Sequence, residues 1–339
     1  MRRTTNFVAL LLVILIAAAC GGAATPTAAP QAQPVAPAAT TAPAAAPTAA
    51  PAATKAPTAA PAATTAPAAT TAPAATTAAA PAANLSGKLT AAGSSALLPL
   101  MQLAATQFQT ANKDVQISVT AGGSGAGRSQ VCKGQITIGN SDVKLSDKEK
   151  TDLNCADAVE TAVAIQAFGA VANKQGPGKL ASLSKDQLVG IFSGQTKNWK
   201  DLGGDDQAIV LVNRAKGSGT RANMAKYLFG GDDTKFATGA SEEDNNETVL
   251  QTISQTPGAV SYLGFAYLNN PAIVAFAIDN TQPTRENIQN GKWPIAAPGY
   301  SITKGQPSPL AKAFLDYVLS SQFQNSPEFA KLGFVPVAK

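Results

Sequence analysis

Three turns rich in glycine and hydroxyl side chains lie between strand-like and helix-like runs, and they constrain the fold more than any other feature. They are residues 93–95 (Gly-Ser-Ser), 122–127 (Gly-Gly-Ser-Gly-Ala-Gly) and 217–220 (Gly-Ser-Gly-Thr). Strand–turn–helix units are typical of α/β proteins, which bind ligands where the strands end. A helix that begins in such a turn offers unpaired N–H groups and a partial positive charge. The sequence therefore predicts an α/β fold with an anion site built from several helix N-termini.

The third turn has the residues best suited to binding an anion. An apolar run at 208–212 precedes it, a helix-like run at 222–228 follows it, and Arg214 stands just before it. A guanidinium is a planar fork that suits an oxyanion, and Ser218 and Thr220 add hydroxyl donors. The alternative interpretation is an ordinary helix start with an unrelated surface arginine.

Hydrophobic periodicity predicts further elements of the domain. Strands are expected at 88–92, 115–120, 136–139, 162–172, 208–212 and 259–262, and helices at 96–111, 128–133, 184–192, 222–228, 249–254 and 309–319. The acidic run Glu242-Glu243-Asp244 lacks the pattern of an EF-hand calcium loop and is interpreted as a solvated loop.

Residues 1–20 have the features of an export signal. Arg2 and Arg3 precede an apolar run over residues 7–16, which is shorter than the roughly 20 residues that cross a bilayer. Three alanines then lead to Cys20, as in a bacterial lipobox. We therefore expect Cys20 to carry the lipid (palmitate) and to become the mature N-terminus. The alternative is an ordinary signal peptide with an incidental cysteine.

Residues 21–84 consist almost entirely of Ala, Pro and Thr, with Lys55 as their only charged residue. Such a composition cannot bury apolar surface, so it predicts a disordered linker. Folding is expected from residue 85 to 339, which is long enough for two lobes. The chain has 26 Lys and Arg against 21 Asp and Glu, but three of the cations precede residue 85. The folded part is therefore nearly neutral, and no nucleic-acid partner is expected.

The chain contains no histidine, which excludes Ser-His-Asp and Cys-His catalysis and any His-ligated metal site. With Cys20 assigned to lipidation, Cys132 and Cys155 remain as an even pair in an oxidising compartment. A disulfide between them is predicted, with two buried thiols as the alternative. We expect no metal, no cofactor and no catalytic residue.

A series of motifs, in this order along the chain, resembles the phosphate-binding proteins of bacterial ABC-type phosphate importers, the PstS family. The motifs are Ala92-Gly93-Ser94-Ser95, residues 123–127 followed by Gly139-Asn140-Ser141-Asp142, residues 188–194 with Asn198-Trp199, residues 217–221 and residues 256–262. The resemblance implies a type II periplasmic-binding-protein fold, in which two α/β lobes close on the ligand. Lobe I would comprise residues 85–167 plus 264–339, and lobe II residues 168–263.

The resemblance also implies the residues of a phosphate site. By position they are Ser95, the backbone N–H of Ala96, Ser124, Asp142, Arg214, Ser218, Gly219 and Thr220, with Arg221 adding positive field. Asp142 is informative because a carboxylate repels an anion unless the ligand carries a proton. Phosphate carries one near neutral pH and sulfate does not, so Asp142 favours phosphate. The alternative is that Asp142 caps a helix at 145–150.

Two positions depart from the family pattern. Lys216 stands where many relatives have an acid that pairs with the site arginine, so the anion preference of the family need not carry over unchanged. Ala96 replaces a bulkier residue, which matters little if only its N–H is used.

The sequence thus predicts a monomeric, lipid-anchored, extracytoplasmic protein that captures inorganic phosphate and delivers it to the permease subunits of an ABC importer. A receptor for another tetrahedral oxyanion (sulfate, tungstate or molybdate) is the alternative within the class. A hydrolase or phosphatase using Ser124 or Ser218, and a surface adhesion or structural protein, are alternatives from other classes.

Overall fold

A computed structural model describes residues 85–337, all of which belong to one compact unit, Thr76–Lys339. The predictions for residues 1–20, including lipidation of Cys20, and for residues 21–84 lie outside the described residues. Within residues 85–337, no helix has the length and apolar character needed to cross a membrane.

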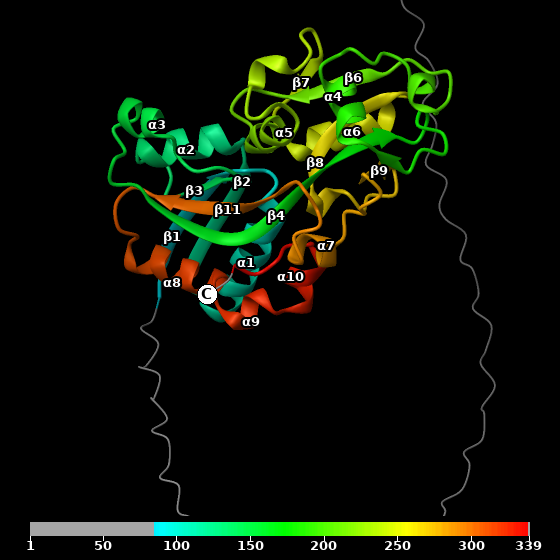
Figure 1. The fold of residues 1–339 in the computed structure, drawn as a ribbon. Helices are drawn as coiled ribbons and strands as arrows, with labels where there is room; N and C mark the ends of the chain where they lie inside the picture. Colours follow the sequence, from blue (N-terminus) through cyan, green and yellow to red (C-terminus); the bar gives the residue numbers. More distant parts are fainter. Residues whose placement is uncertain (1–84, 338–339) are drawn as a thin grey trace, which may run out of the picture. The chain divides into compact units, whose positions relative to one another are not determined.

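The described chain alternates between strands and helices (Figure 1). The strands are β1 (Gly87–Gly93), β2 (Val115–Ala121), β3 (Ile138–Ser141), β4 (Val159–Asn173), β5 (Ser182–Leu183), β6 (Val210–Arg214), β7 (Ser241–Glu243), β8 (Ala259–Gly264), β9 (Ile273–Ala275), β10 (Ala277–Ile278) and β11 (Ala296–Thr303). The helices are α1 (Leu98–Ala111), α2 (Ser124–Cys132), α3 (Asp147–Asp152), α4 (Lys185–Phe192), α5 (Gly219–Phe229), α6 (Asn246–Gln255), α7 (Arg285–Gln289), α8 (Pro309–Val318), α9 (Ser321–Gln324) and α10 (Pro327–Lys331).

Nine of the described strands form one mixed sheet in the order β2-β1-β3-β11-β4-β8-β6-β7, with β9 also paired to β4. At one end β1 runs parallel to β2 and β3, and at the other β6 runs parallel to β7 and β8. The antiparallel strands β11 and β4 join these two parallel groups. In each parallel group, the carboxyl ends of the strands therefore lie at the same edge of the sheet, next to turns that lead into helices.

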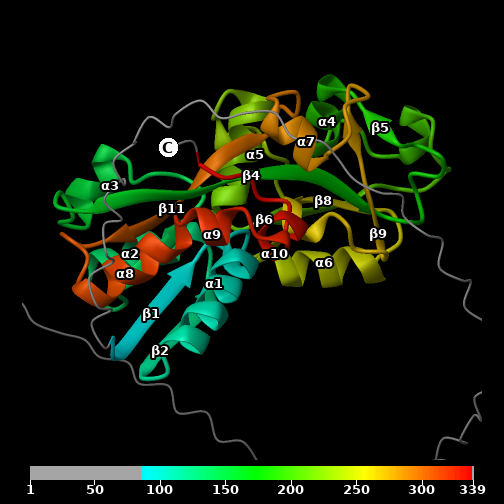
Figure 2. The same cartoon turned by 90° about the horizontal axis from the view of Figure 1, so that it is seen from below.

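Two large apolar clusters form the cores of the described part of the molecule. The first core contains Phe108, Val163, Ala164 and Phe314, and the second contains Phe168, Val171, Trp199 and Tyr262. The strand β4 belongs to both, because its first half pairs with β11 and its second half pairs with β8 and β9. In Figures 1 and 2 this strand runs through the whole molecule, from the side of α3 to β9.

The helices of the first core follow from the apolar spacing of their sequences. In α1 the buried residues recur at helical spacing, including Leu100, Met101, Ala104 and Phe108. Ser308 caps α8 by accepting a hydrogen bond from the N–H of Ala311, and Pro309 occupies its first turn. The rings of Phe108 and Phe314 meet edge to face, 5.5 Å apart, and so pack α1 against α8.

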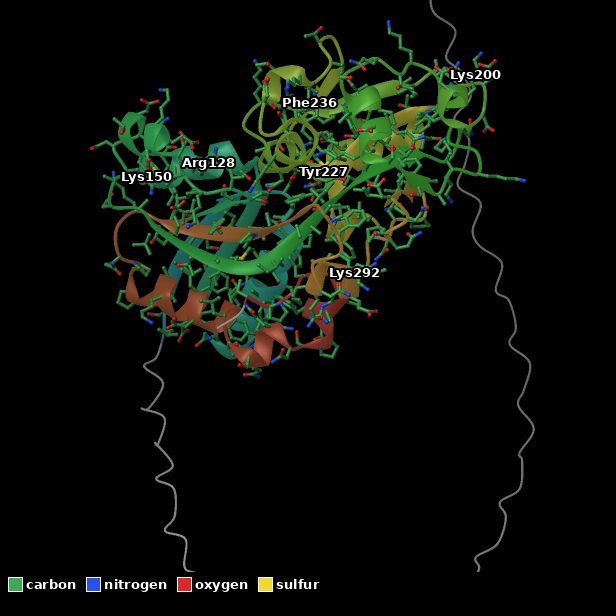
Figure 3. All side chains as sticks on the ribbon, viewed as in Figure 1. Arg128, Lys150, Lys200, Tyr227, Phe236 and Lys292 are labelled. Atoms are coloured by element: carbon green, nitrogen blue, oxygen red, sulfur yellow. A yellow bond between two sulfur atoms is a disulfide. The ribbon has the colours of Figure 1, made fainter. Side chains whose placement is uncertain are left out.

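The predicted disulfide is confirmed: Cys132, the last residue of α2, is bonded to Cys155, which follows α3. Both cysteines are buried in a small cluster with Val131, Leu145 and Ile302. Arg128, labelled in Figure 3, pairs with Glu149 of α3 at 2.7 Å. The helix α2 is thus fastened to the segment that follows β3 by a covalent bond and by an ion pair.

The predicted elements are present, but several boundaries differ. The helix expected from residue 96 begins at Leu98, because residues 95–97 form a turn in which Ser94 Oγ accepts the N–H groups of Ala96 and Leu97. The helix expected at 128–133 begins earlier, at Ser124, because Gly123 adopts a φ of 82° and turns the chain directly into the helix.

The predicted lobe boundary at residues 263/264 stays a prediction. The strand β9 pairs with the second half of β4, and Trp293 and Ile295 belong to the second core. The second core therefore includes residues beyond 264.

Replacing Cys132 and Cys155 together with alanine should lower the free energy of unfolding by about 3 kcal/mol, as loop-closure entropy predicts for a separation of 23 residues. Urea unfolding followed by circular dichroism measures the change. An unchanged free energy of unfolding would contradict this loop-closure effect.

Candidate functional site

Five chain segments meet between the two cores, and each follows a strand. The first core contributes the segments after β1, β2 and β3, with Ser94 and Ser95, Ser124, and Asp142 respectively. The second contributes the end of β6 with the start of α5, and the segment between β7 and α6. Parallel strands place such segments at the same edge of a sheet, which is where α/β proteins bind ligands.

Asp142 is buried at the centre of this arrangement, with 3% of its surface exposed. Its Oδ1 atom accepts hydrogen bonds from Ser94 Oγ and from Gln166 Nε2, the latter at 3.0 Å. Its Oδ2 atom accepts one from Thr220 Oγ1 at 3.2 Å. A carboxylate oxygen can accept two hydrogen bonds, so Oδ2 has capacity for one more donor.

Asp142 is not a helix cap. Ser146 caps α3, because its hydroxyl accepts the N–H of Glu149 and the Glu149 side chain accepts the N–H of Ser146. The alternative interpretation of Asp142 is therefore wrong. Instead, burial raises the pKa of Asp142 above its usual value, by more than its hydrogen bonds and the nearby Arg214 lower it. In its ionised form, Asp142 can accept a further hydrogen bond at Oδ2 from a ligand that carries a proton.

Arg214, the last residue of β6, is also buried, with 1% of its surface exposed. Its guanidinium donates to the carbonyl oxygens of Glu243 at 3.2 Å and Asp244 at 2.9 Å, and its Nη2 atom lies 3.4 Å from Ser95 Oγ. Its Nη1 atom is buried and has no hydrogen-bond partner among the described residues. Burial lowers the pKa of Arg214, and the charge of Asp142 partly offsets that effect.

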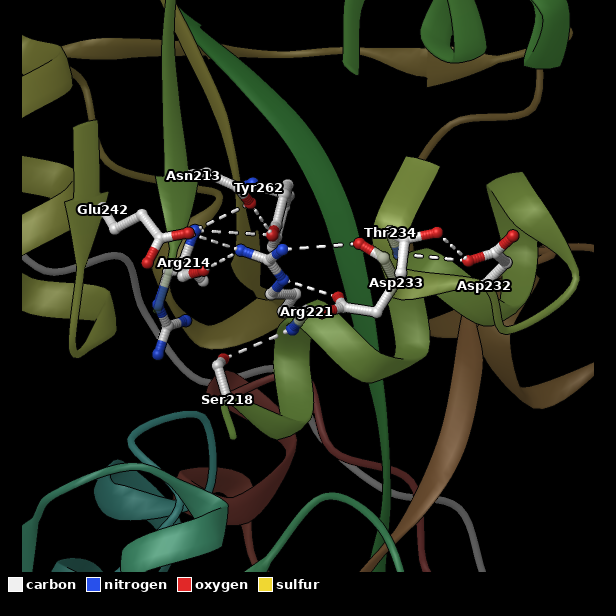
Figure 4. Close-up of polar contacts among 9 residues, drawn as sticks. All are labelled: Asn213, Arg214, Ser218, Arg221, Asp232, Asp233, Thr234, Glu242 and Tyr262. Carbon is white, nitrogen blue, oxygen red and sulfur yellow. Dashed lines mark hydrogen bonds and ion pairs between the residues drawn. The ribbon is translucent and has the colours of Figure 1, made fainter. Parts of the chain in front are cut away.

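The two arginines on either side of the third turn have different roles. In Figure 4 the guanidinium of Arg221 lies between Glu242 and Asp233, and it forms ion pairs with both. It also donates to the carbonyl oxygen of Arg214 at 2.7 Å and lies over the ring of Phe236. Among residues 85–337, no carboxylate lies within ion-pair distance of Arg214, so its charge remains available to an anion.

The second and third turns touch each other. The N–H of Gly125 donates to the carbonyl oxygen of Gly217 at 2.9 Å. Gly219 lies so close to the opposite turn that a Cβ atom on it would be 2.3 Å from Ser124 Oγ and 2.6 Å from Asp142 Cβ. Glycine at 219 is therefore required by the close approach of the two turns.

The hydroxyl groups predicted from the sequence all lie in this region. Ser124 Oγ accepts the N–H of Asp142 at 3.0 Å, which leaves its own hydrogen available to donate. Ser218 is the N-cap of α5. Because α5 begins at Gly219, the N–H groups of Gly219 and Thr220 have no acceptor within the helix.

Two predicted features look different in the structure. The N–H of Ala96, expected to bind the ligand, donates to Ser94 Oγ at 3.1 Å, and its role in ligand binding stays a prediction. Lys216 is exposed and forms no ion pair with another described residue. Among residues 85–337, no group of three or more Cys, Asp or Glu residues is arranged to hold a metal ion.

Several polar residues that support the site were missed by the sequence analysis. They are Ser94 and Gln166, which donate to Asp142, Asn223, which donates to the carbonyl oxygens of Asp142 and Gly219, and Asn246, which donates to Ser95. Of these residues, only Ser94 could have been identified from the sequence, because it lies within the first glycine- and hydroxyl-rich turn. Gln166 lies in the middle of an apolar run, and Asn223 and Asn246 lie in helices whose packing the sequence does not reveal.

Gly219→Ala should destabilise the protein by about 1–3 kcal/mol, because the new Cβ would force Ser124 and Asp142 away. Gly122→Ala is the matched control: its Cβ would meet only Ala126, at an ordinary 3.8 Å. Urea unfolding of both variants measures the difference. Equal stabilities would contradict the close contact between the second and third turns.

Asp142→Asn should remove a pH dependence of stability. Because the folded pKa of Asp142 is raised, the folded state holds this proton more tightly than the unfolded state. Wild-type stability should then fall as pH rises from the usual Asp value through the folded pKa. In buffers free of phosphate and sulfate, the free energy of unfolding of the variant relative to wild type should rise over that interval. A difference independent of pH would contradict the raised pKa.

Comparison with known proteins identifies the family of the chain. A family model for the PBP superfamily domain matches residues 50–322. The phosphate-binding protein PstS of Bacillus subtilis (strain 168) is 45% identical over 252 residues, which cover 74% of this chain and 81% of the relative.

Solved structures show the same fold. One, from Clostridium perfringens, is described as a putative phosphate ABC transporter substrate-binding protein with bound phosphate. It has a TM-score of 0.68 at 26% identity, and the match covers 74% of this chain and 100% of the C. perfringens chain. An ABC-type phosphate transport receptor from Vibrio cholerae, at 22% identity, has a TM-score of 0.57 with coverages of 74% and 100%, and it supports the fold alone. The predicted type II periplasmic-binding-protein fold is confirmed, and the chain belongs to the PBP superfamily and, within it, to the family of the phosphate-binding proteins PstS.

Proposed function

We propose that this protein binds inorganic phosphate between its two cores and delivers it to an ABC importer. The observation that carries the proposal is the buried Arg214, whose Nη1 donor has no partner among the described residues. An isolated buried cation costs several kcal/mol, so an anionic ligand would stabilise it. The family relationship supports phosphate as that anion, since the B. subtilis relative is a phosphate-binding protein.

The ligand contacts would come from both cores. The proposed donors are the hydroxyl groups of Ser95, Ser124, Ser218 and Thr220, the N–H groups of Ala96, Gly219 and Thr220, and the guanidinium of Arg214. Neutral donors and helix N-termini offset the charge of an anion without a matching number of cations.

Asp142 would accept a hydrogen bond from the protonated oxygen of the bound phosphate. Its Oδ2 atom has one acceptor position left after Thr220. A fully deprotonated anion such as sulfate would place two negative charges together and leave this buried acceptor unpaired. A site built around such a hydrogen bond discriminates by up to about 10⁴–10⁵ against a ligand that lacks the donor.

The cellular context follows from the family and from the N-terminal sequence. We place the protein outside the cytoplasm, anchored to the membrane by a lipid on Cys20, with the two lobes closing on the ligand about the strands β4 and β11. It would act as a monomer that binds and releases phosphate without making or breaking a bond.

A receptor for another oxyanion remains the second candidate. Lys216 favours it, because a lysine replaces the acid expected beside the site arginine, but Lys216 is exposed whereas Arg214 is buried. A hydrolase using Ser124 or Ser218 has less support. In the structure Ser124 Oγ and Ser218 Oγ accept backbone N–H groups, and the chain has no histidine that could serve as a base.

Calorimetric titration of the chain with phosphate, after bound anions are removed, tests the proposal. One-to-one binding of phosphate at neutral pH with no response to sulfate is the expected result. Tighter binding of sulfate, molybdate or tungstate would move the assignment to that anion. No heat with any of them would overturn the proposed function.

Asp142→Asn should weaken the discrimination between phosphate and sulfate at neutral pH, because the amide removes the negative charge that repels sulfate. Asp244→Asn is the matched control: it removes the same charge nearby, while the Asp244 carbonyl that binds Arg214 is kept. Competition titrations measure the affinity ratio for each variant. Sulfate that stays fully excluded from the Asp142→Asn variant would argue against the proton-acceptor role.

A further inference from the structure

The side chain of Asn246 joins two segments that are distant in sequence. Asn246 is the first residue of α6 and is fully buried. Its Oδ1 atom accepts the N–H of Gly264 at the end of β8, at 3.0 Å, and its Nδ2 atom lies 2.8 Å from Ser95 Oγ. A backbone N–H can only donate, so Gly264 forces the amide oxygen to face it. The amide NH₂ must therefore face Ser95.

Asn246 also fixes what the Ser95 hydroxyl can do. The backbone N–H of Asn246 donates to Ser95 Oγ as well, at 3.0 Å. A hydroxyl oxygen has two lone pairs and one hydrogen, so these two donors occupy both lone pairs. Arg214 Nη2 also faces this oxygen, at 3.4 Å, so the hydroxyl hydrogen cannot point toward Arg214 either. The hydroxyl hydrogen of Ser95 must then point away from α6 and from Arg214.

The hydroxyl hydrogen of Ser95 and the Nη1 group of Arg214 are thus two neighbouring, buried hydrogen-bond donors. In every hydrogen bond described for Ser95 Oγ, that oxygen is the acceptor. Arg214 Nη1 has no acceptor among the described residues. Two adjacent donors without acceptors match the oxygens of a tetrahedral anion, whereas an unconstrained hydroxyl could turn toward a protein acceptor instead.

We propose that Asn246 is a positioning residue of the phosphate site, which forces the hydroxyl of Ser95 to donate its hydrogen to the bound anion. The inference rests on the proposed function, because it assigns a supporting residue to the same site. It also links ligand binding to α6 and to Gly264, where β8 ends.

An aspartate at position 246 separates this role from simple packing. It has the shape of asparagine and keeps an acceptor for the N–H of Gly264, but it replaces the NH₂ donor with a second acceptor. The hydrogen of Ser95 would turn toward that acceptor and leave the anion. An alanine removes the amide without adding an acceptor. The proposed role therefore predicts that the Asn246→Asp variant binds phosphate more weakly than the Asn246→Ala variant. A role in packing alone predicts the opposite order.

Calorimetric titration of the full chain with inorganic phosphate tests the inference. We expect Asn246→Ala to weaken binding about tenfold and Asn246→Asp by roughly a further tenfold, as for lost hydrogen bonds to a charged group. Asn245→Asp is the matched control for charge. It adds the same negative charge one residue away, where the side chain caps α6 through the N–H of Thr248, and it should bind phosphate within about threefold of wild type.

A double-mutant cycle with Ser95→Ala isolates the orientation of the hydroxyl. Asn246→Ala should cost little affinity once Ser95 is replaced, because there is then no hydrogen to direct. An equal cost in both backgrounds, or an Asn246→Asp protein that binds like wild type, would overturn the inference. A wild-type protein that gives no heat with phosphate would instead overturn the proposed function itself.

Discussion

Two opposite charges, the carboxylate of Asp142 and the guanidinium of Arg214, are buried where the two cores meet. No described carboxylate forms an ion pair with Arg214, so each charge is held by neutral groups: Asp142 by Ser94, Gln166 and Thr220, and Arg214 by backbone carbonyl oxygens. Burying unpaired charges is costly, and hydrogen bonds only partly offset that cost. The arrangement keeps one donor of Arg214 and one acceptor position of Asp142 available, which is what a protonated oxyanion requires.

The rest of the fold keeps these two charges in place. The strand β4 belongs to both cores and carries Gln166, so the carboxylate of Asp142 is tied directly to the connection between them. The disulfide and the Arg128–Glu149 pair fasten α2, which begins at Ser124, to the segment that begins at Asp142. The close approach of Gly219 to Ser124 then sets how near the two halves can come. Rigid supports of this kind preorganise a polar site, so its donors need little reorganisation when an anion binds.

Selectivity in such a site depends on the number and direction of hydrogens as well as on charge. Gly264 orients the amide of Asn246, and Asn246 in turn occupies the lone pairs of Ser95. Each step follows from which atoms can only donate and which can only accept. The same rule applied to Asp142 distinguishes a ligand that carries a proton from one that does not. In the proposed site, the ligand would be matched by a series of oriented donors that extends beyond the residues in contact with it.

The amino-acid sequence alone specified the strand–turn–helix units and most predicted strands and helices, because glycine turns, caps and apolar periodicity are local signals. It also predicted the disulfide, because Cys132 and Cys155 are the two cysteines left once Cys20 is assigned to lipidation. It missed β11, since Pro298 and Gly299 interrupt its apolar pattern and only pairing with β3 and β4 makes it a strand. It also assigned Glu242, Glu243 and Asp244 to a solvated loop, whereas β7 ends at Glu243 and the carbonyl oxygens of Glu243 and Asp244 hold Arg214. Backbone acceptors and amide groups such as Gln166 and Asn246 carry no sequence signature of their role. The folded arrangement of the chain selects which of them surround the buried charges, because those contacts join residues up to 151 positions apart.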